Sequence, residues 1–159
     1  MVFQMSNSFV VDTNVLVFAE THHHEKRIDA VCFVTHLWKN SIIALDAPFG
    51  VIFKQYKNNL PNTGFVFDII LRMMSKANKV TFGKRALPRT VSNDLNSPPM
   101  FDINDLIFIE VAYATRSNIV TEDIQSGDFD SRVKNTCKEN IGIDILTILE
   151  ANNTIMRAR

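Results

Sequence analysis

Apolar residues fall into two patterns along this chain, short continuous runs and longer stretches with helical spacing. The continuous runs are typical of strands that are buried on both faces of a sheet. They are Phe9–Val11, Ile42–Leu45, Asn118–Thr121, Ile143–Leu146 and the shorter candidate Val80–Phe82.

Helical spacing of apolar residues separates these runs. It predicts helices over Val15–Glu20, His24–Lys39, Pro48–Tyr56, Asn62–Lys76 and Asp102–Ala114, and a terminal helix capped by Thr147. Apart from its strand candidate, the Pro- and Asn-rich segment 79–100 is predicted to be a loop. The alternation of strands and helices predicts an α/β fold with three layers, α/β/α, around a central parallel sheet.

Length and composition are those of an ordinary globular protein, with 159 residues, 46% of them apolar and 21% charged. We expect a single domain over 1–159. The start of the chain lacks a secretion signal and no apolar run is long enough to span a bilayer, so we expect no membrane partner and a cytoplasmic location. Cys32 and Cys137 lack any zinc or redox spacing, which favours free thiols.

Polar residues follow the first strand directly, as Asp12-Thr13-Asn14. In parallel α/β sheets, ligands gather at the carboxyl ends of strands, and a carboxylate held there suits a hard metal ion. Asn14 is a suitable cap for the next helix. The alternative interpretation is that Asp12 itself only caps that helix.

Acids recur at two more places that a parallel sheet brings to the same edge. Thr121-Glu122-Asp123 ends a second strand, and Asp105 lies in the first turn of a helix for which Asp102 is the predicted cap. Clustered carboxylates repel one another unless a cation lies among them. Mg²⁺ or Mn²⁺ fits such a set, and either ion can activate a water for attack on a phosphodiester. Asp128 and Asp130 are assigned to a turn, with an outer metal ligand as the alternative.

The net charge is zero, but its distribution is uneven. Residues 54–89 hold eight basic residues against one acid, and residues 90–130 hold eight acids against one base. Such a division suits a protein that binds a polyanion with one surface and metal ions with another, although two solvated faces would produce the same pattern. The predicted RNA contacts are Lys79, Lys84, Arg85 and Arg89, and Phe82 is a candidate for stacking on a base.

The order of these segments resembles the PIN-domain family. It consists of a strand followed by Asp-Thr-Asn, then Asp-Leu-Ile-Phe-Ile-Glu-Val-Ala on a helix, then Ile-Val-Thr-Glu-Asp. Many members of that family are metal-dependent ribonucleases, including the toxins of toxin–antitoxin pairs. The resemblance implies that Asp12, Asp105 and Asp123 bind the metal, that Thr121 is the hydroxyl residue of the last motif, and that Thr13 and Asn14 shape the first turn. It also permits an antitoxin-like partner, and we expect a homodimer.

One position departs from the family pattern. A Glu is usual on the helix after the second strand, and the alignment places Lys54 there. A protonated lysine can contact a phosphate but cannot bind a metal ion. Asp102 or Glu110 is a possible replacement carboxylate. Two hypotheses therefore stay open, an active ribonuclease and a PIN-like module that binds RNA or a protein without cleaving.

Overall fold

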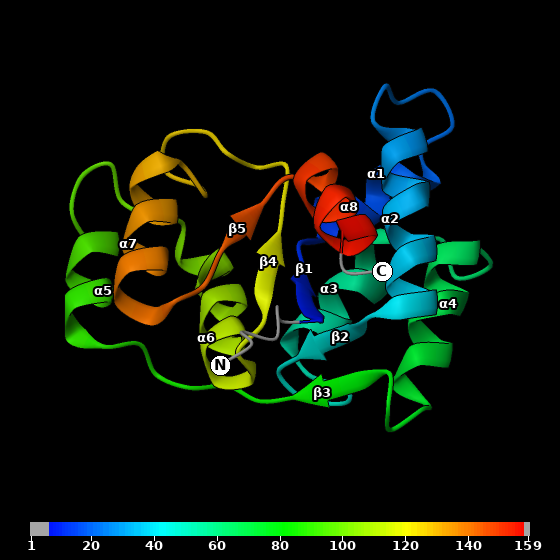
Figure 1. Ribbon diagram of the computed structural model, residues 1–159, viewed down its shortest axis with the longest axis horizontal. Coiled ribbons are helices and arrows are strands. Elements are labelled where there is room, and N and C mark those ends of the chain that lie inside the picture. Colours follow the sequence, from blue (N-terminus) through cyan, green and yellow to red (C-terminus); the bar gives the residue numbers. More distant parts are fainter. Residues whose placement is uncertain (1–6, 158–159) are drawn as a thin grey trace.

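The computed structural model describes residues 7–157 and shows an α/β protein with a five-stranded, all-parallel sheet (Figure 1). The strand order is β3-β2-β1-β4-β5, so the chain builds the sheet outward from β1 in both directions. The elements are β1 (Ser8–Val11), α1 (Thr13–Glu20), α2 (Arg27–Asn40), β2 (Ile42–Leu45), α3 (Val51–Asn59), α4 (Phe65–Met74), β3 (Val80–Phe82), α5 (Arg89–Leu95), the 3-10 turn η1 (Ile103–Asp105), α6 (Leu106–Thr115), β4 (Asn118–Val120), α7 (Ser131–Ile141), β5 (Ile145–Leu146) and α8 (Ile148–Arg157).

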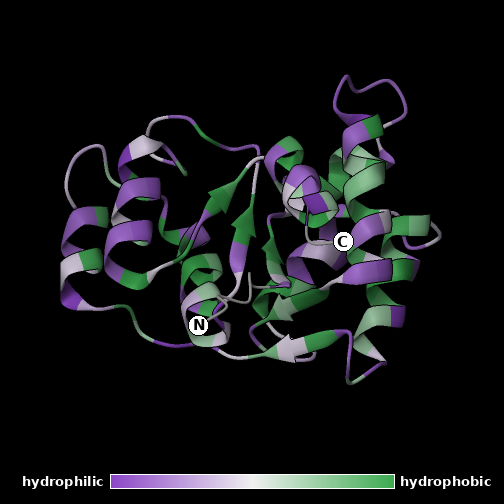
Figure 2. Cartoon of the chain, in the orientation of Figure 1, coloured by the Kyte–Doolittle hydropathy of each residue, from purple (hydrophilic) through white to green (hydrophobic). Residues whose placement is uncertain are grey.

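The central strands are buried on both faces, as their continuous apolar runs predict. Phe9, Val10 and Val11 of β1 are at most 1% exposed, and Val11 pairs with Val120 of β4. Figure 2 shows these strands as hydrophobic, in contrast to the hydrophilic helices α5 and α7. The predicted parallel sheet between helical layers is therefore confirmed.

Helix α6 packs across β1, β2, β3 and β4, while α2 packs against α8 on the opposite face (Figure 1). Helix α6 is deeply buried, with Phe108, Ile109 and Val111 all 0% exposed. Helix α3 lies beside α1 and α6. This arrangement brings α1, α3 and α6 together next to the carboxyl end of β1.

Two predictions in the acidic half of the chain are wrong. The segment 79–100 was expected to be a loop beyond its strand, but it includes α5, which begins directly after Pro88. The chain between β4 and β5 forms another helix, α7, which was not among the predicted elements. The carboxylate of Asp130 caps it. Helices α5 and α7 pack together at one end of the molecule (Figure 1).

The predicted helix caps have mixed outcomes. Asn14 is not a cap, because α1 begins at Thr13 and Asn14 lies inside the helix. Asp102 does cap, accepting a hydrogen bond from the Asn104 amide at 2.9 Å. Thr147 caps α8 through a reciprocal pair of hydrogen bonds with Glu150, each 3.2 Å long.

Candidate functional site

Asp12 lies where β1 ends and α1 begins, and only 7% of the residue is exposed. Its Oδ2 accepts a hydrogen bond from the Thr121 hydroxyl at 2.7 Å and a longer one from the Asn14 side chain at 3.3 Å. Burial raises the pKa of Asp12, while the Thr121 hydroxyl and the amides of Thr13 and Asn14 oppose that shift. The carboxylate is therefore fixed in place and not free to turn toward solvent.

Thr121 connects two of the predicted metal-binding acids. Besides donating to Asp12, its hydroxyl oxygen accepts a hydrogen bond from the backbone amide of Asp123 at 3.0 Å. The side chain is 0% exposed, so water does not compete for these bonds. The ends of β1 and β4 are thus held in a fixed relation by one hydroxyl group.

Asp105 lies at the junction of η1 and α6 and is half-buried. Burial, followed by the negative charges of Asp12, Asp102, Asp123 and Asp128, raises the pKa of Asp105 to about 7. A carboxyl group whose pKa is raised by the charges of four other carboxylates belongs to an acidic cluster. The structure therefore brings the three predicted acids, Asp12, Asp105 and Asp123, to one end of the sheet.

The most closely spaced carboxylates are not the predicted three. Oxygen atoms of Asp102, Asp105 and Asp128 all lie within 4.8 Å of one another. Burial and then the neighbouring Asp123 raise the pKa of Asp128 to about 6. From the sequence, Asp128 was assigned to a turn, with an outer metal ligand as the alternative. Its position close to Asp102 and Asp105 supports the alternative.

This donor set fits a hard divalent cation. Three carboxylates can supply the oxygen ligands that Mg²⁺ and Mn²⁺ prefer. Burial and neighbouring carboxylates raise the pKa of Asp105 and of Asp128, so the charged forms of these two groups are disfavoured without a cation nearby. A bound cation would supply that missing charge.

Helix α3 approaches the first turn of the site with Gln55. The Thr13 hydroxyl donates a hydrogen bond to Oε1 of Gln55 at 3.2 Å. Lys54, the residue aligned with the usual Glu, is exposed. Since each residue turns an α-helix by about 100°, a shift of one position changes which side chain reaches the site. Gln55 is neutral, so α3 contributes no charge at Thr13.

Two further acids near strand ends have structural roles. Asp46 accepts hydrogen bonds from the amides of Val51 and Ile52, at 2.8 and 3.0 Å, and so caps α3. Glu122 pairs with Lys26 at 3.0 Å and accepts the Ile148 amide at 2.9 Å, which caps α8. Glu122 therefore joins α2, β4 and α8, whereas its neighbour Asp123 belongs to the acidic cluster.

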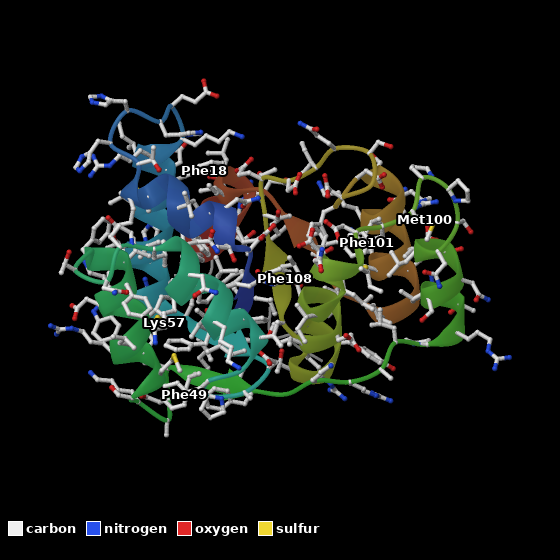
Figure 3. The ribbon with its side chains drawn as sticks, turned by 180° about the vertical axis from the view of Figure 1, so that it is seen from behind. Phe18, Phe49, Lys57, Met100, Phe101 and Phe108 are labelled. Carbon is white, nitrogen blue, oxygen red and sulfur yellow. The ribbon has the colours of Figure 1, made fainter. Side chains whose placement is uncertain are left out.

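Arg132, near the start of α7, binds the loop that leads to Asp102. Its guanidinium donates to the carbonyl oxygens of Ser97, Pro98 and Pro99, at 2.9, 3.2 and 2.6 Å. The amide of Asp102 also donates to the Gly127 carbonyl at 3.0 Å. Nearby, the rings of Phe101 (labelled in Figure 3) and Phe129 meet edge to face, as their interplanar angle of 75° shows. These contacts, which the sequence did not reveal, bring Asp102 and Asp128 together.

The structure separates the basic residues that were predicted to contact RNA. Lys79 precedes β3 and lies over the Trp38 ring with Lys76, so it is at the opposite edge of the sheet from Asp12. Arg85 stacks on the ring of Tyr113 in α6, 4.3 Å from its centroid. Lys84 lies two residues after the end of β3, and Arg89 is the first residue of α5. Both side chains are exposed.

In comparisons with known proteins, no family model matches this chain and no curated protein is significantly similar to it. Among residues 7–157, no helix has both the length and the apolar content required to cross a membrane.

Proposed function

We propose that this protein is a ribonuclease of the PIN type that depends on Mg²⁺ or Mn²⁺ and cleaves phosphodiesters at the acidic cluster. One observation carries the proposal: five carboxylates from three segments interact at one end of a parallel sheet. The charge repulsion among them disfavours the metal-free form. A fold has no need of such a cluster for stability, but a metal-dependent hydrolase does.

The residues that would hold the cation are Asp102, Asp105 and Asp128, with Asp123 beside them. Bound there, Mg²⁺ or Mn²⁺ lowers the pKa of a water and neutralises charge that develops on the phosphate. Asp12, fixed by Thr121, adds a hydrogen-bond acceptor that can orient the attacking water. The resemblance of the Asp12, Asp105 and Asp123 segments to the PIN family supports a metal site at this end of the parallel sheet, although it implies Asp12 and Asp123 as ligands where the closest carboxylates are those of Asp102 and Asp128.

The decisive experiment incubates the purified protein with labelled single-stranded RNA and Mn²⁺. We expect cleavage that EDTA stops and that Asp12→Asn abolishes. Asp68→Asn is a matched control, since Asp68 is exposed on α4 and pairs only with Arg72. RNA that stays intact at every Mn²⁺ concentration would exclude the ribonuclease function.

A second candidate function is a PIN-like module that binds RNA or a protein without cleaving it. The observation that favours it is the absence of a carboxylate on α3: Lys54 stands where the family resemblance implies a Glu, and the side chain that contacts Thr13 is the uncharged amide of Gln55. RNA binding without hydrolysis would support this function. The homodimer, the antitoxin-like partner and the cytoplasmic location stay predictions, which copurification and light scattering can test.

A further inference from the structure

We propose that single-stranded RNA is held by a stacking surface formed by Phe49, Phe82, Lys54 and Lys84. The inference rests on the proposed function, because it names how the same protein holds its substrate. The charge pattern alone indicated a different set of cations. The structure points instead to two exposed aromatic rings with lysines beside them.

Both rings of the stacking surface are available to a ligand. Phe49 is 71% exposed and Phe82 is 41% exposed, although most of the other apolar side chains of the chain pack in the core. Phe49 meets the ring of Phe53 edge to face, with the centroids 5.4 Å apart. This contact restrains Phe49 without covering it. Nucleic-acid bases stack on such rings with little regard to sequence.

The two rings come from the ends of neighbouring strands. Phe82 is the last residue of β3, its partner in β2 is Leu45, and the Gly83 amide donates to the Leu45 carbonyl at 3.0 Å. The turn that carries Phe49 begins at the next residue, Asp46, and it folds back because Asp46 caps α3. Figure 3 shows Phe49 at this end of the molecule.

Lysines without ion-pair partners lie on the same two segments as the rings. Lys54 and Lys57 on α3 and Lys84 after β3 are exposed, and none of them forms an ion pair within residues 7–157. Figure 3 labels Lys57 and Phe49. Between residues 47 and 93 the only acid is Asp68, which is paired with Arg72. Aromatic rings next to unpaired lysines fit the bases and phosphates of a polyanion better than an apolar protein surface.

Helix α3 connects the stacking surface to the acidic cluster. Its first residue, Val51, is 50% exposed, and one turn later Gln55 contacts Thr13, the neighbour of Asp12. Four residues of helix advance about 6 Å along its axis. RNA that stacks on Phe49 and follows α3 is therefore directed toward Asp12.

The test measures binding of a fluorescein-labelled single-stranded RNA by anisotropy in EDTA, so that binding does not depend on metal or cleavage. We expect Phe49→Ala and Phe82→Ala each to weaken binding by roughly fivefold to a hundredfold. Phe65→Ala is the matched control, because Phe65 is 40% exposed but lies next to Glu20, at the far end of α3. Melting curves show whether each variant is folded.

Salt dependence tests the lysines separately. We expect Lys84→Ala and Lys54→Ala each to reduce the slope of log affinity against log salt by about 0.7. Lys79→Ala removes the same charge at the opposite edge, over Trp38, and should leave the slope unchanged. Equal slopes for all three variants would contradict the assignment of the lysines.

The outcomes separate this inference from the proposed function. Binding that depends on Phe49 and Phe82 but is never followed by cleavage would support the stacking surface and exclude the nuclease. Cleavage and binding that both persist in the two alanine variants would overturn the stacking surface alone. The stacking surface would also be overturned if the alanine variants bind RNA as tightly as the wild type but have a lower molar mass in light scattering. The rings would then join two copies of the chain.

Discussion

The Thr121 hydroxyl and the Asp12 carboxylate form a buried hydrogen bond of 2.7 Å between the ends of β4 and β1. The bond favours the charged form of Asp12, whereas burial favours the neutral form. Because the same hydroxyl accepts the Asp123 amide, one side chain sets both the position and the ionisation of the site.

We expect Thr121→Val to destabilise the protein by about 1–3 kcal/mol, because the buried carboxylate loses its shortest donor. The pKa of Asp12 should rise further, since the hydroxyl that lowers it is gone. Urea denaturation measures the change in stability. Thr121→Ser keeps the hydroxyl and should retain most of the stability. A larger loss in Thr121→Ser than in Thr121→Val would show that the methyl group matters more than the hydrogen bond.

The raised pKa of Asp105 predicts how stability depends on pH in the absence of metal. Asp105 titrates at about 7 in the folded protein, against about 3.9 for an unfolded aspartate. Between about pH 4 and 7 only the folded state keeps this proton, so stability falls as pH rises through that window. We expect Asp105→Asn to melt at a higher temperature than the wild type at pH 8 in EDTA, with the difference vanishing near pH 4.

Mn²⁺ should restore the stability that the wild type loses as the pH rises. A cation that binds only the folded state raises the melting temperature by mass action, and protons compete with it for Asp105 and Asp128. We therefore expect a larger Mn²⁺-induced shift at pH 8 than at pH 5, and a much smaller one in Asp105→Asn. Calorimetric melting with Mn²⁺ and with EDTA measures it. A shift that is the same at both pH values would contradict binding to these carboxylates.

The apolar pattern was sufficient to predict the layers, the sheet and the three acids at its edge. A continuous run predicts a buried strand, and the parallel arrangement then determines where Asp12 and Asp123 lie relative to each other. It was not sufficient to predict that Asp128 lies next to Asp102. That proximity comes with tertiary contacts, the hydrogen bond from the Asp102 amide to the Gly127 carbonyl and the bonds from Arg132 to the preceding loop, and such contacts leave no periodic signal in the chain.

Helix α7 did leave a signal that was missed. Val133, Cys137 and Ile141 have helical spacing, Asp130 is a typical cap, and Gly142 ends the helix at a φ of 68°. The Gln55 position was missed for another reason. Helix α3 runs from Val51 to Asn59 and not from Pro48 to Tyr56, and the boundaries of helices are what sequence patterns define least sharply.

Gln55→Glu should increase the affinity for Mn²⁺ by about tenfold, because each added carboxylate strengthens an oxygen-ligand site. Without metal the same variant should be less stable than the wild type, since it adds negative charge beside Thr13. Isothermal titration calorimetry measures the affinity. Lys54→Glu is the matched control, because it also adds a carboxylate to α3, but on an exposed position. If Lys54→Glu has the larger effect, Lys54 and not Gln55 faces the site.

Arg132→Met should cost about 2 kcal/mol of stability, because charged groups make strong hydrogen bonds and three carbonyls lose theirs. We expect the affinity for Mn²⁺ to fall as well, since Arg132 joins the start of α7, which follows Asp128, to the loop that precedes Asp102. Arg132→Lys should restore little, because an ammonium group cannot reproduce the planar fork of a guanidinium. Arg89→Met removes an equal charge from the exposed start of α5 and should change neither quantity. Lower stability with an unchanged Mn²⁺ affinity would show that Arg132 supports the fold but does not position the acids.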